Sequence, residues 1–185
     1  MASVFTHLVV GLALGTAFRR DPTPRRFWFA GALGSACPDL DAVGYWAGVP
    51  YGHLLGHRGL THSPAFAAAL AATIVACAFP RRVWPHPRAP LWLYLFLAIA
   101  SHGVLDATTN GGLGVAFLAP FSAERWFLPW RPIWVSPIGV RAFFTPYGLD
   151  VLVTEILWVW LPALGFVAGA AVLRRRRGRR PATGS

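Results

Sequence analysis

Five apolar runs, separated by segments rich in arginine or proline, constrain the fold of this chain more than any other feature. A helix needs about 20 mostly apolar residues to cross a bilayer, and the runs approach that length. With 55% hydrophobic residues, the 185-residue chain is also more apolar than an ordinary soluble domain. We therefore predict an all-α, polytopic membrane bundle of about five spans. The runs cover residues 2–18, 27–49, 64–79, 90–105 and 149–173.

Arginine is unevenly distributed between these runs. It clusters in residues 19–26, 81–88 and 174–180, and the net charge is +10. The positive-inside rule places all three clusters in the cytoplasm, which requires five crossings with the N-terminus outside and the C-terminus inside. We therefore expect a multi-pass protein of a bacterial-type cytoplasmic (inner) membrane. It would comprise one domain over residues 1–173 and a basic cytoplasmic tail over 174–185, and that tail is better explained by anionic lipid than by nucleic acid.

The segment 111–148 is rich in proline, tryptophan and phenylalanine. Its prolines prevent a regular span. Trp126, Trp130 and Trp134 are typical of the membrane–water interface, so we predict a re-entrant or surface-lying loop on the outer side. Arg125 and Arg131 in this loop either bind lipid headgroups or anchor the loop at the interface.

Polar side chains that can bind metal all fall on the predicted outer side. The chain has only seven carboxylates, and ionisable groups in a membrane are costly, so buried ones are candidates for function. His102 and Asp106 are four residues apart and would share one face of a helix. Asp39 and Asp41 follow the helix-breaking Pro38, and irregular backbone at membrane depth is tolerated where it lines a protein cavity. The candidate ligands are His7, Asp39, Asp41, His57, His62, His102 and Asp106.

The stretch HRGLTHS, residues 57–63, contributes two of these histidines around a glycine that permits a turn. Thr61 or Ser63 can cap the helix expected to begin at Pro64. Arg58 can hold a phosphate oxygen bidentately, or it can form a salt bridge to Asp39 or Asp41. The substrate-contact candidates, which combine cationic and neutral hydrogen-bonding groups, are Arg58, Thr61, Asn110, Arg125 and Arg131.

Four histidines and three aspartates exceed the four ligands that one zinc ion takes. Seven ligands suit two metals with a bridging carboxylate, as in many phosphoester-cleaving enzymes. The mixed nitrogen and oxygen donors favour two zinc ions, with manganese or iron as alternatives. Each motif alone also has a structural explanation, such as a buried histidine or a helix cap. Their common placement favours metal binding.

Several motifs resemble one known family. They are His7, ACPDLDAV, HRGLTHS, SHGVLDATTNGG and PFSAERWFLPWRPIWVSPIG, and together they resemble the YdjM/YbcI-like family of membrane-bound metal-dependent hydrolases. The resemblance runs from His7 to the last apolar run and implies metal-dependent hydrolysis. The ligand order is also distantly similar to that of zinc-dependent phospholipases C and single-strand nucleases, which implies that Asp106 bridges two metals. Unlike those enzymes, this chain has no second His and HxxxE set after His102.

The sequence therefore predicts a membrane hydrolase that cleaves a phosphoester of a lipid or lipid-linked substrate at the outer face, using water activated by metal. Asp39 or Asp41 would act as general base or as ligand, and spacing does not decide between these roles. One alternative is a membrane metal-binding or transport protein without hydrolysis. Another is a polar cluster that only ties helices together.

Overall fold

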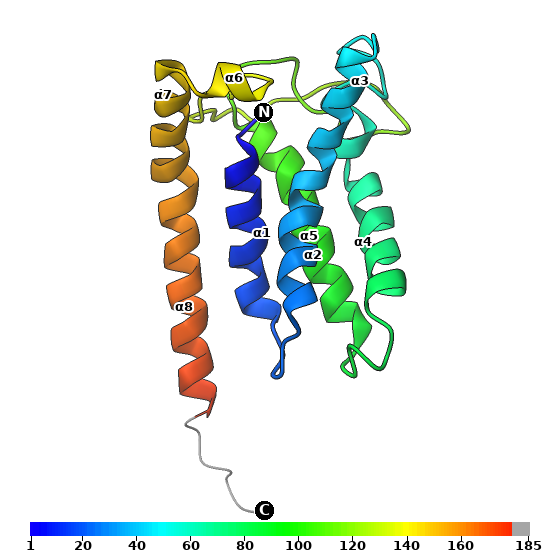
Figure 1. The fold of residues 1–185 in the computed structure, drawn as a ribbon, viewed down its shortest axis with the longest axis vertical. Coiled ribbons are helices and arrows are strands. Elements are labelled where there is room, and N and C mark those ends of the chain that lie inside the picture. Colours follow the sequence, from blue (N-terminus) through cyan, green and yellow to red (C-terminus); the bar gives the residue numbers. More distant parts are fainter. Residues whose placement is uncertain (179–185) are drawn as a thin grey trace, which may run out of the picture.

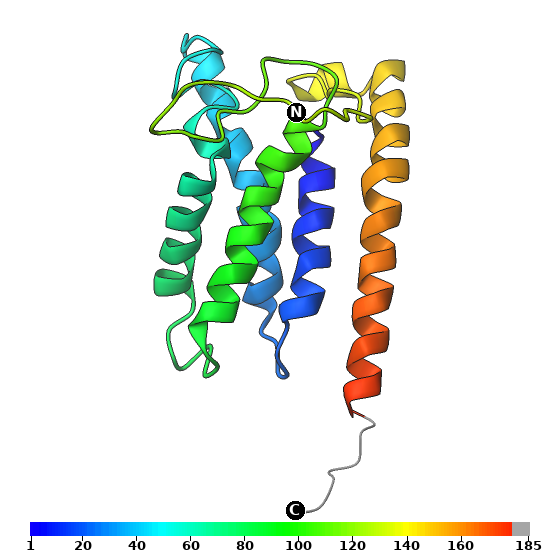
Figure 2. The same cartoon turned by 180° about the vertical axis from the view of Figure 1, so that it is seen from behind.

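The computed structural model describes residues 1–178, and they form a helical bundle that confirms the predicted all-α class. The helices run side by side along the long axis of the molecule (Figures 1 and 2). The last of them is one continuous rod in which a π-helical turn, η3, joins two α-helices. The long elements are α1 (Val4–Phe18), α2 (Arg25–Ala36), α4 (Pro64–Ala78), α5 (Arg88–Ala107), α7 (Pro146–Glu155), η3 (Ile156–Trp160) and α8 (Leu161–Gly178).

Two helical stretches of the described chain are long and apolar enough to cross a membrane. They are Arg88–Ala107 and Pro146–Arg176, with mean hydropathies of 1.3 and 2.1. Helices α1 and α4 are apolar but shorter. Helix α8 continues to Gly178, so the first residues of the predicted basic tail are helical, while residues 179–185 lie outside the described part.

Two local signals in the sequence explain why the helices begin and pack where they do. Helix α4 begins at Pro64, and Ser63 caps it by accepting a 3.1 Å hydrogen bond from the Phe66 amide. Of the two predicted caps, the structure therefore selects Ser63. Helices α1 and α2 approach closely at Gly11, where an added Cβ would lie 2.6 Å from the Gly31 carbonyl oxygen.

The second apolar run is not one helix. Helix α2 stops at Ala36 and is followed by the 3-10 segment η1 (Cys37–Asp41), which contains Pro38, and then by α3 (Ala42–Trp46). A proline cannot donate a helical hydrogen bond and crowds the preceding turn, so the break falls where the sequence predicted it. The break places two aspartates at the end of the bundle that holds the N-terminus (Figure 1).

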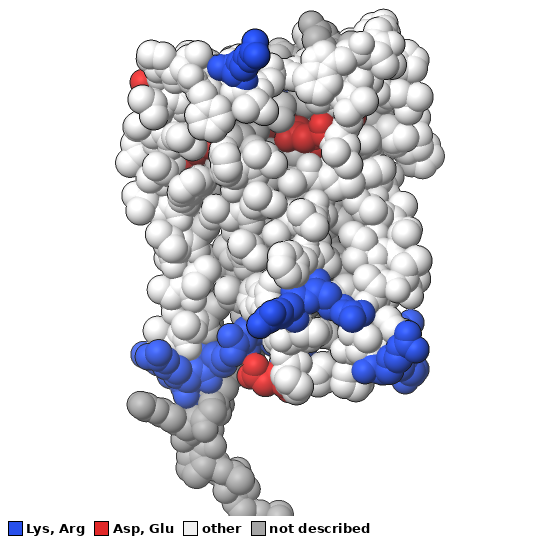
Figure 3. All heavy atoms as spheres, in the orientation of Figure 1, with Lys and Arg blue, Asp and Glu red and all other residues white. Residues whose placement is uncertain are grey.

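The segment 111–148 lies across this same end of the bundle, as predicted for a surface-lying loop (Figures 1 and 2). Most of it is irregular, although it includes α6 (Val140–Phe143) and the first residues of α7. Trp126, Trp130 and Trp134 are 47%, 59% and 40% exposed, which suits side chains at a membrane surface. Arginines gather at the opposite end of the molecule (Figure 3).

Candidate metal centre

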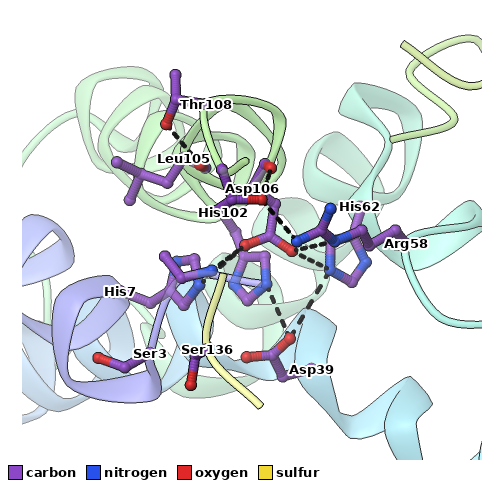
Figure 4. Close-up of polar contacts among 12 residues, drawn as sticks. Ser3, His7, Asp39, Arg58, His62, His102, Leu105, Asp106, Thr108 and Ser136 are labelled. Carbon is purple, nitrogen blue, oxygen red and sulfur yellow. Dashed lines mark hydrogen bonds and ion pairs between the residues drawn. The ribbon is translucent and has the colours of Figure 1, made fainter. Parts of the chain in front are cut away.

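The seven candidate ligands meet at the N-terminal end of the bundle, although they come from separate parts of the chain. Figure 4 shows five of them, His7, Asp39, His62, His102 and Asp106. Helix α1 supplies one histidine, and the two aspartates of η1 come from the broken second run. The loop before η2 (Leu60–His62) and η2 itself supply two more histidines. The last two ligands project from neighbouring turns of α5. The residues are His7, Asp39, Asp41, His57, His62, His102 and Asp106.

Four of these residues offer atoms within 4.8 Å of one another, namely Asp39, His62, His102 and Asp106. Asp39 Oδ1 lies 3.2 Å from His102 Nε2 and 3.8 Å from His62 Nε2. His62 Nε2 lies 3.5 Å from Asp106 Oδ2. Neighbouring ligands of a tetrahedral zinc with bonds of 2.0–2.1 Å are about 3.3 Å apart. The spacing of this group therefore suits one metal ion with little rearrangement.

Several buried atoms of this group lack hydrogen bonds, including His62 Nε2 and Asp39 Oδ2. Buried polar atoms in folded proteins are nearly always hydrogen-bonded, so such atoms at one point need a further explanation. His102 is already oriented, because its Nδ1 lies 2.7 Å from the Ser35 carbonyl oxygen. When Nδ1 donates that hydrogen bond, Nε2 presents its lone pair toward Asp39, which is the tautomer that metal binding requires.

His7 lies beside the four-residue group. Its Nε2 is 3.6 Å from Asp106 Oδ1, and its ring stacks on that of His102 with centroids 3.5 Å apart. Both ring nitrogens of His7 are buried without a hydrogen bond. His7 is therefore available as a further nitrogen donor.

Asp41, His57 and His62 form a second group able to hold a metal. His57 Nδ1 lies 2.6 Å from Asp41 Oδ1, which is a hydrogen-bond distance and shorter than the separation of two ligands on one ion. The other oxygen, Oδ2, accepts hydrogen bonds from the Thr61 hydroxyl and the Arg58 amide. In this arrangement Asp41 orients the two histidines, as carboxylates beside metal-bound histidines commonly do.

His62 belongs to both groups, because its Nε2 faces the first and its Nδ1 lies 3.2 Å from Asp41 Oδ2. Burial alone would lower the pKa of His62. The carboxylates of Asp106 and Asp41 outweigh that effect and raise the pKa to about 9. Without a metal, His62 therefore carries a proton that a metal ion would have to displace.

Arg58 is fully buried and forms its ion pair with Asp106, not with Asp39 or Asp41 as the sequence suggested. Its Nε lies 3.0 Å from Asp106 Oδ2, and its two terminal nitrogens donate to the Gly111 carbonyl and the Thr109 hydroxyl, each at 2.9 Å. These contacts tie Asp106, a metal-ligand candidate, to the loop that follows α5. Contact of Arg58 with a phosphate stays a prediction.

The turn in HRGLTHS differs from the expected one. The residue with positive φ is Arg58, at 62°, whereas Gly59 has a φ of −85°. Gly59 is required for a different reason, since a Cβ there would lie 2.1 Å from the Leu54 carbonyl oxygen. The close approach of two backbone segments at Gly59 fixes the loop that carries both histidines.

The remaining substrate-contact candidates hold loops together. Thr61 contacts Asp41 and His62 within the cluster. The exposed Asn110 accepts a hydrogen bond from the Val135 amide. Arg125 donates to the carbonyl oxygens of Tyr51, His53, His57 and Gly114, and the exposed Arg131 lies over the Phe127 ring.

Glu155 was not among the predicted site residues, yet its side chain is fully buried. It accepts hydrogen bonds from the amide and hydroxyl of Ser3, and the adjacent Ala2 amide donates to Asp106 Oδ1 at 2.7 Å. The segment before α1 therefore links Glu155 to a metal-ligand candidate. A carboxylate inside an apolar run was the available signal, because such a group is rarely placed there without a partner.

The site opens to one side of the bundle. Acidic side chains are visible in a recess on the face shown in Figure 3, near the end that carries the N-terminus. Asp39 is the most exposed of the ligand candidates, at 11% of its side chain, whereas Asp41 is at 3% and Asp106, His62 and His102 are at 0%. A ligand from outside would therefore meet Asp39 first.

The fold and the cluster define an apolar helical bundle with a candidate histidine–aspartate metal centre. The chain belongs to the YdjM inner membrane protein family, which it matches over residues 1–178, and this confirms the predicted family. Inner membrane protein YbcI of Escherichia coli (strain K12) is 41% identical over 179 residues, covering 95% of this chain and all of that protein. Uncharacterized protein YfhP of Bacillus subtilis (strain 168) is 30% identical over 152 residues, covering 77% of this chain and 41% of that protein. No solved structure matches the chain.

Proposed function

We propose that this inner membrane protein is a metal-dependent hydrolase that cleaves a phosphoester of a lipid or lipid-linked substrate at the outer face of the membrane. The observation that carries the proposal is the group of Asp39, His62, His102 and Asp106, whose ligand atoms lie within 4.8 Å of one another. Such a group is costly to bury in an apolar bundle unless a cation satisfies it.

The orientation follows from the two ends of the bundle. Arginines gather at the end opposite the site (Figure 3), and arginine-rich segments face the cytoplasm. We propose five crossings, by α1, α2, α4, α5 and the α7–η3–α8 rod, with the cluster outside and the C-terminus in the cytoplasm. Supporting this, the C-terminal rod is very apolar, and only 6% of its most apolar stretch is buried within the protein.

Zinc fits the nitrogen and oxygen donors best, with manganese or iron as alternatives. The two groups that share His62 correspond to the two ions expected from the number of ligands. The group of Asp41, His57 and His62 should bind its ion more weakly, because that ion would have to break the hydrogen bond between His57 and Asp41. We therefore expect one tightly bound ion and a weaker second one.

Bound in the first group, such an ion would polarise the phosphoester and activate water for attack. Of the two predicted proton acceptors, the geometry favours Asp39, because its Oδ2 has no hydrogen bond and its side chain reaches the recess. Both oxygens of Asp41 are occupied, so it orients His57 and His62. Arg58 balances the charge of Asp106.

A lipid substrate is supported by the apolar surroundings of the recess. Leu40 lies beside Asp39 in the chain and is 68% exposed, and Val43 and Trp46 on α3 are 58% and 67% exposed. Exposed apolar side chains of this size next to a polar site suit a substrate with one apolar and one polar end.

The test is elemental analysis of the purified protein together with hydrolysis of a chromogenic phosphodiester and of phospholipids in mixed micelles. A His102→Ala, Asp106→Ala double variant should lose both the metal and the activity. A matched control, His53→Ala with Asp150→Asn, changes two exposed residues of the same types and should keep both. Retention of metal and activity by the first variant would refute the proposal.

The purified protein can also be used to distinguish hydrolysis from the alternative function, metal transport. Transport predicts metal flux in proteoliposomes without turnover of any phosphoester. The bundle between the site and the arginine end is filled by apolar side chains such as Phe27, Leu91 and Leu95, which counts against a polar path there.

A further inference from the structure

A cleft of about 670 Å³ lies at the arginine end of the molecule, far from the metal-ligand cluster. It is bounded by the C-terminal end of α1, the start of α5 and the C-terminal half of α8. Its walls are apolar, formed in part by Phe18, Pro90, Phe166 and Leu173. The metal site contributes none of its lining residues, so the two sites are separate.

Three arginines stand at the edge of this cleft, namely Arg19, Arg20 and Arg174. Arg174 donates to the carbonyl oxygens of Thr16 and Arg19, and so completes the C-terminal end of α1. Asp21 pairs with Arg19 at 3.3 Å, with both side chains partly exposed. Three cationic groups against one carboxylate leave the mouth of the cleft positive (Figure 3).

The cleft exists because α8 carries small residues where it faces α1 and α5. Gly169 and Ala170 line the cleft, and a Cβ added at Gly169 would meet no atom within 4 Å. Folded proteins are close-packed and leave few empty spaces, so an apolar cleft of this size between membrane helices offers room for a lipid chain. Basic pockets between such helices on the cytoplasmic side suit anionic lipid headgroups.

We propose that this cleft binds one anionic phospholipid, with an acyl chain between α8 and the α1–α5 pair and the headgroup phosphate on Arg19, Arg20 and Arg174. The site rests on the inner-membrane location of the protein and on the proposed orientation, and it is independent of hydrolysis. The lipid attaches α8, most of whose apolar surface faces away from the bundle, to the rest of the protein.

The test is native mass spectrometry of the detergent-purified protein with phosphatidylglycerol or phosphatidylcholine added at equal concentration. The wild-type protein should retain one phosphatidylglycerol and markedly less phosphatidylcholine. Gly169→Leu fills the cleft without touching an arginine and should abolish this retention. Gly165→Leu is the matched control, because it lies one turn away, outside the cleft lining, and also meets no atom within 4 Å.

A second pair of variants tests the headgroup. Arg20→Gln should weaken phosphatidylglycerol binding about fivefold, since one arginine near an anionic headgroup contributes about that much. Arg25→Gln removes an exposed arginine at the same end that does not line the cleft, and should have no such effect. Equal retention of the two lipids, or wild-type retention by a folded Gly169→Leu protein, would overturn the proposal. Neither result bears on metal content or phosphoester hydrolysis.

Discussion

Arg58 and Asp106 form a fully buried ion pair, and breaking it should be one of the most destabilising single changes in the metal-free protein. Both side chains are 0% exposed, with Nε and Oδ2 3.0 Å apart. Arg58→Met removes the guanidinium partner of the buried Asp106 carboxylate and leaves the protonated His62, 3.5 Å away, as a weaker partner, and breaking such a buried pair costs about 3–5 kcal/mol. Loss of the hydrogen bonds to Gly111 and Thr109 places the expected cost toward the upper end.

The assay is thermal unfolding in detergent with a chelator present, followed by tryptophan fluorescence. For a protein of this size the loss corresponds to a fall in Tm on the order of 10 °C. The chelator is necessary because a metal ion on Asp106 would compensate for the missing guanidinium. Arg131→Met is the control, since that arginine is exposed and lies over the Phe127 ring, and its cost should stay within about 0.5 kcal/mol.

A double-mutant cycle separates the ion pair from general damage to the fold. Asp106→Asn alone leaves Arg58 without its buried carboxylate partner, whereas the Arg58→Met, Asp106→Asn protein lacks both charges of the pair. The double variant should therefore be more stable than the sum of the single effects predicts, by about 2–3 kcal/mol. Additive costs would show that the two side chains do not stabilise each other, and the account of Arg58 as the partner of Asp106 would fail.

Three further changes follow from the same geometry. Gly103→Ala places a Cβ 2.5 Å from the His62 carbonyl oxygen, so it should displace η2 and lower bound metal per protein, as measured by elemental analysis. Glu155→Ala leaves the Ser3 amide and hydroxyl without their buried acceptor and should lower the free energy of unfolding by about 1–3 kcal/mol, measured by the same thermal assay. The His62 pKa of about 9 lies above its ordinary 6.5, so its stabilising effect is full below pH 6.5 and disappears as pH rises through 9. Zinc affinity should rise over that interval by up to roughly tenfold per pH unit in chelator competition, and an affinity independent of pH would contradict the pairing.

The ends of the bundle and the composition of the site were predictable because they rest on local rules. The arginine clusters indicated which loops share one end of the bundle, while the assignment of that end to the cytoplasm stays a prediction. The spacing of His102 and Asp106 put both on one helical face, and Pro38 marked the break that brings Asp39 to the site. Ser63 and Pro64 together indicated where α4 begins.

The partners inside the site were not predictable from the sequence, because they depend on how distant segments meet. Arg58 pairs with Asp106 only because its loop lies over the end of α5. The contact between Ser3 and Glu155 joins residues 152 positions apart. The positive φ fell on Arg58 because its buried ion pair and hydrogen bonds hold that backbone conformation, which its side chain alone would disfavour.

The charges of the cluster bear directly on how many ions it can hold. Among its side chains, Asp39, Asp41 and Asp106 contribute three negative charges and Arg58 one positive charge, which leaves two negative charges when the histidines are neutral. One divalent ion neutralises that excess in a site where unbalanced charge is costly. A second ion would make the site positive, and an anionic phosphoester would offset that charge. Occupancy of the weaker group should therefore increase when a phosphate anion is present, and zinc titration with and without inorganic phosphate measures this coupling directly.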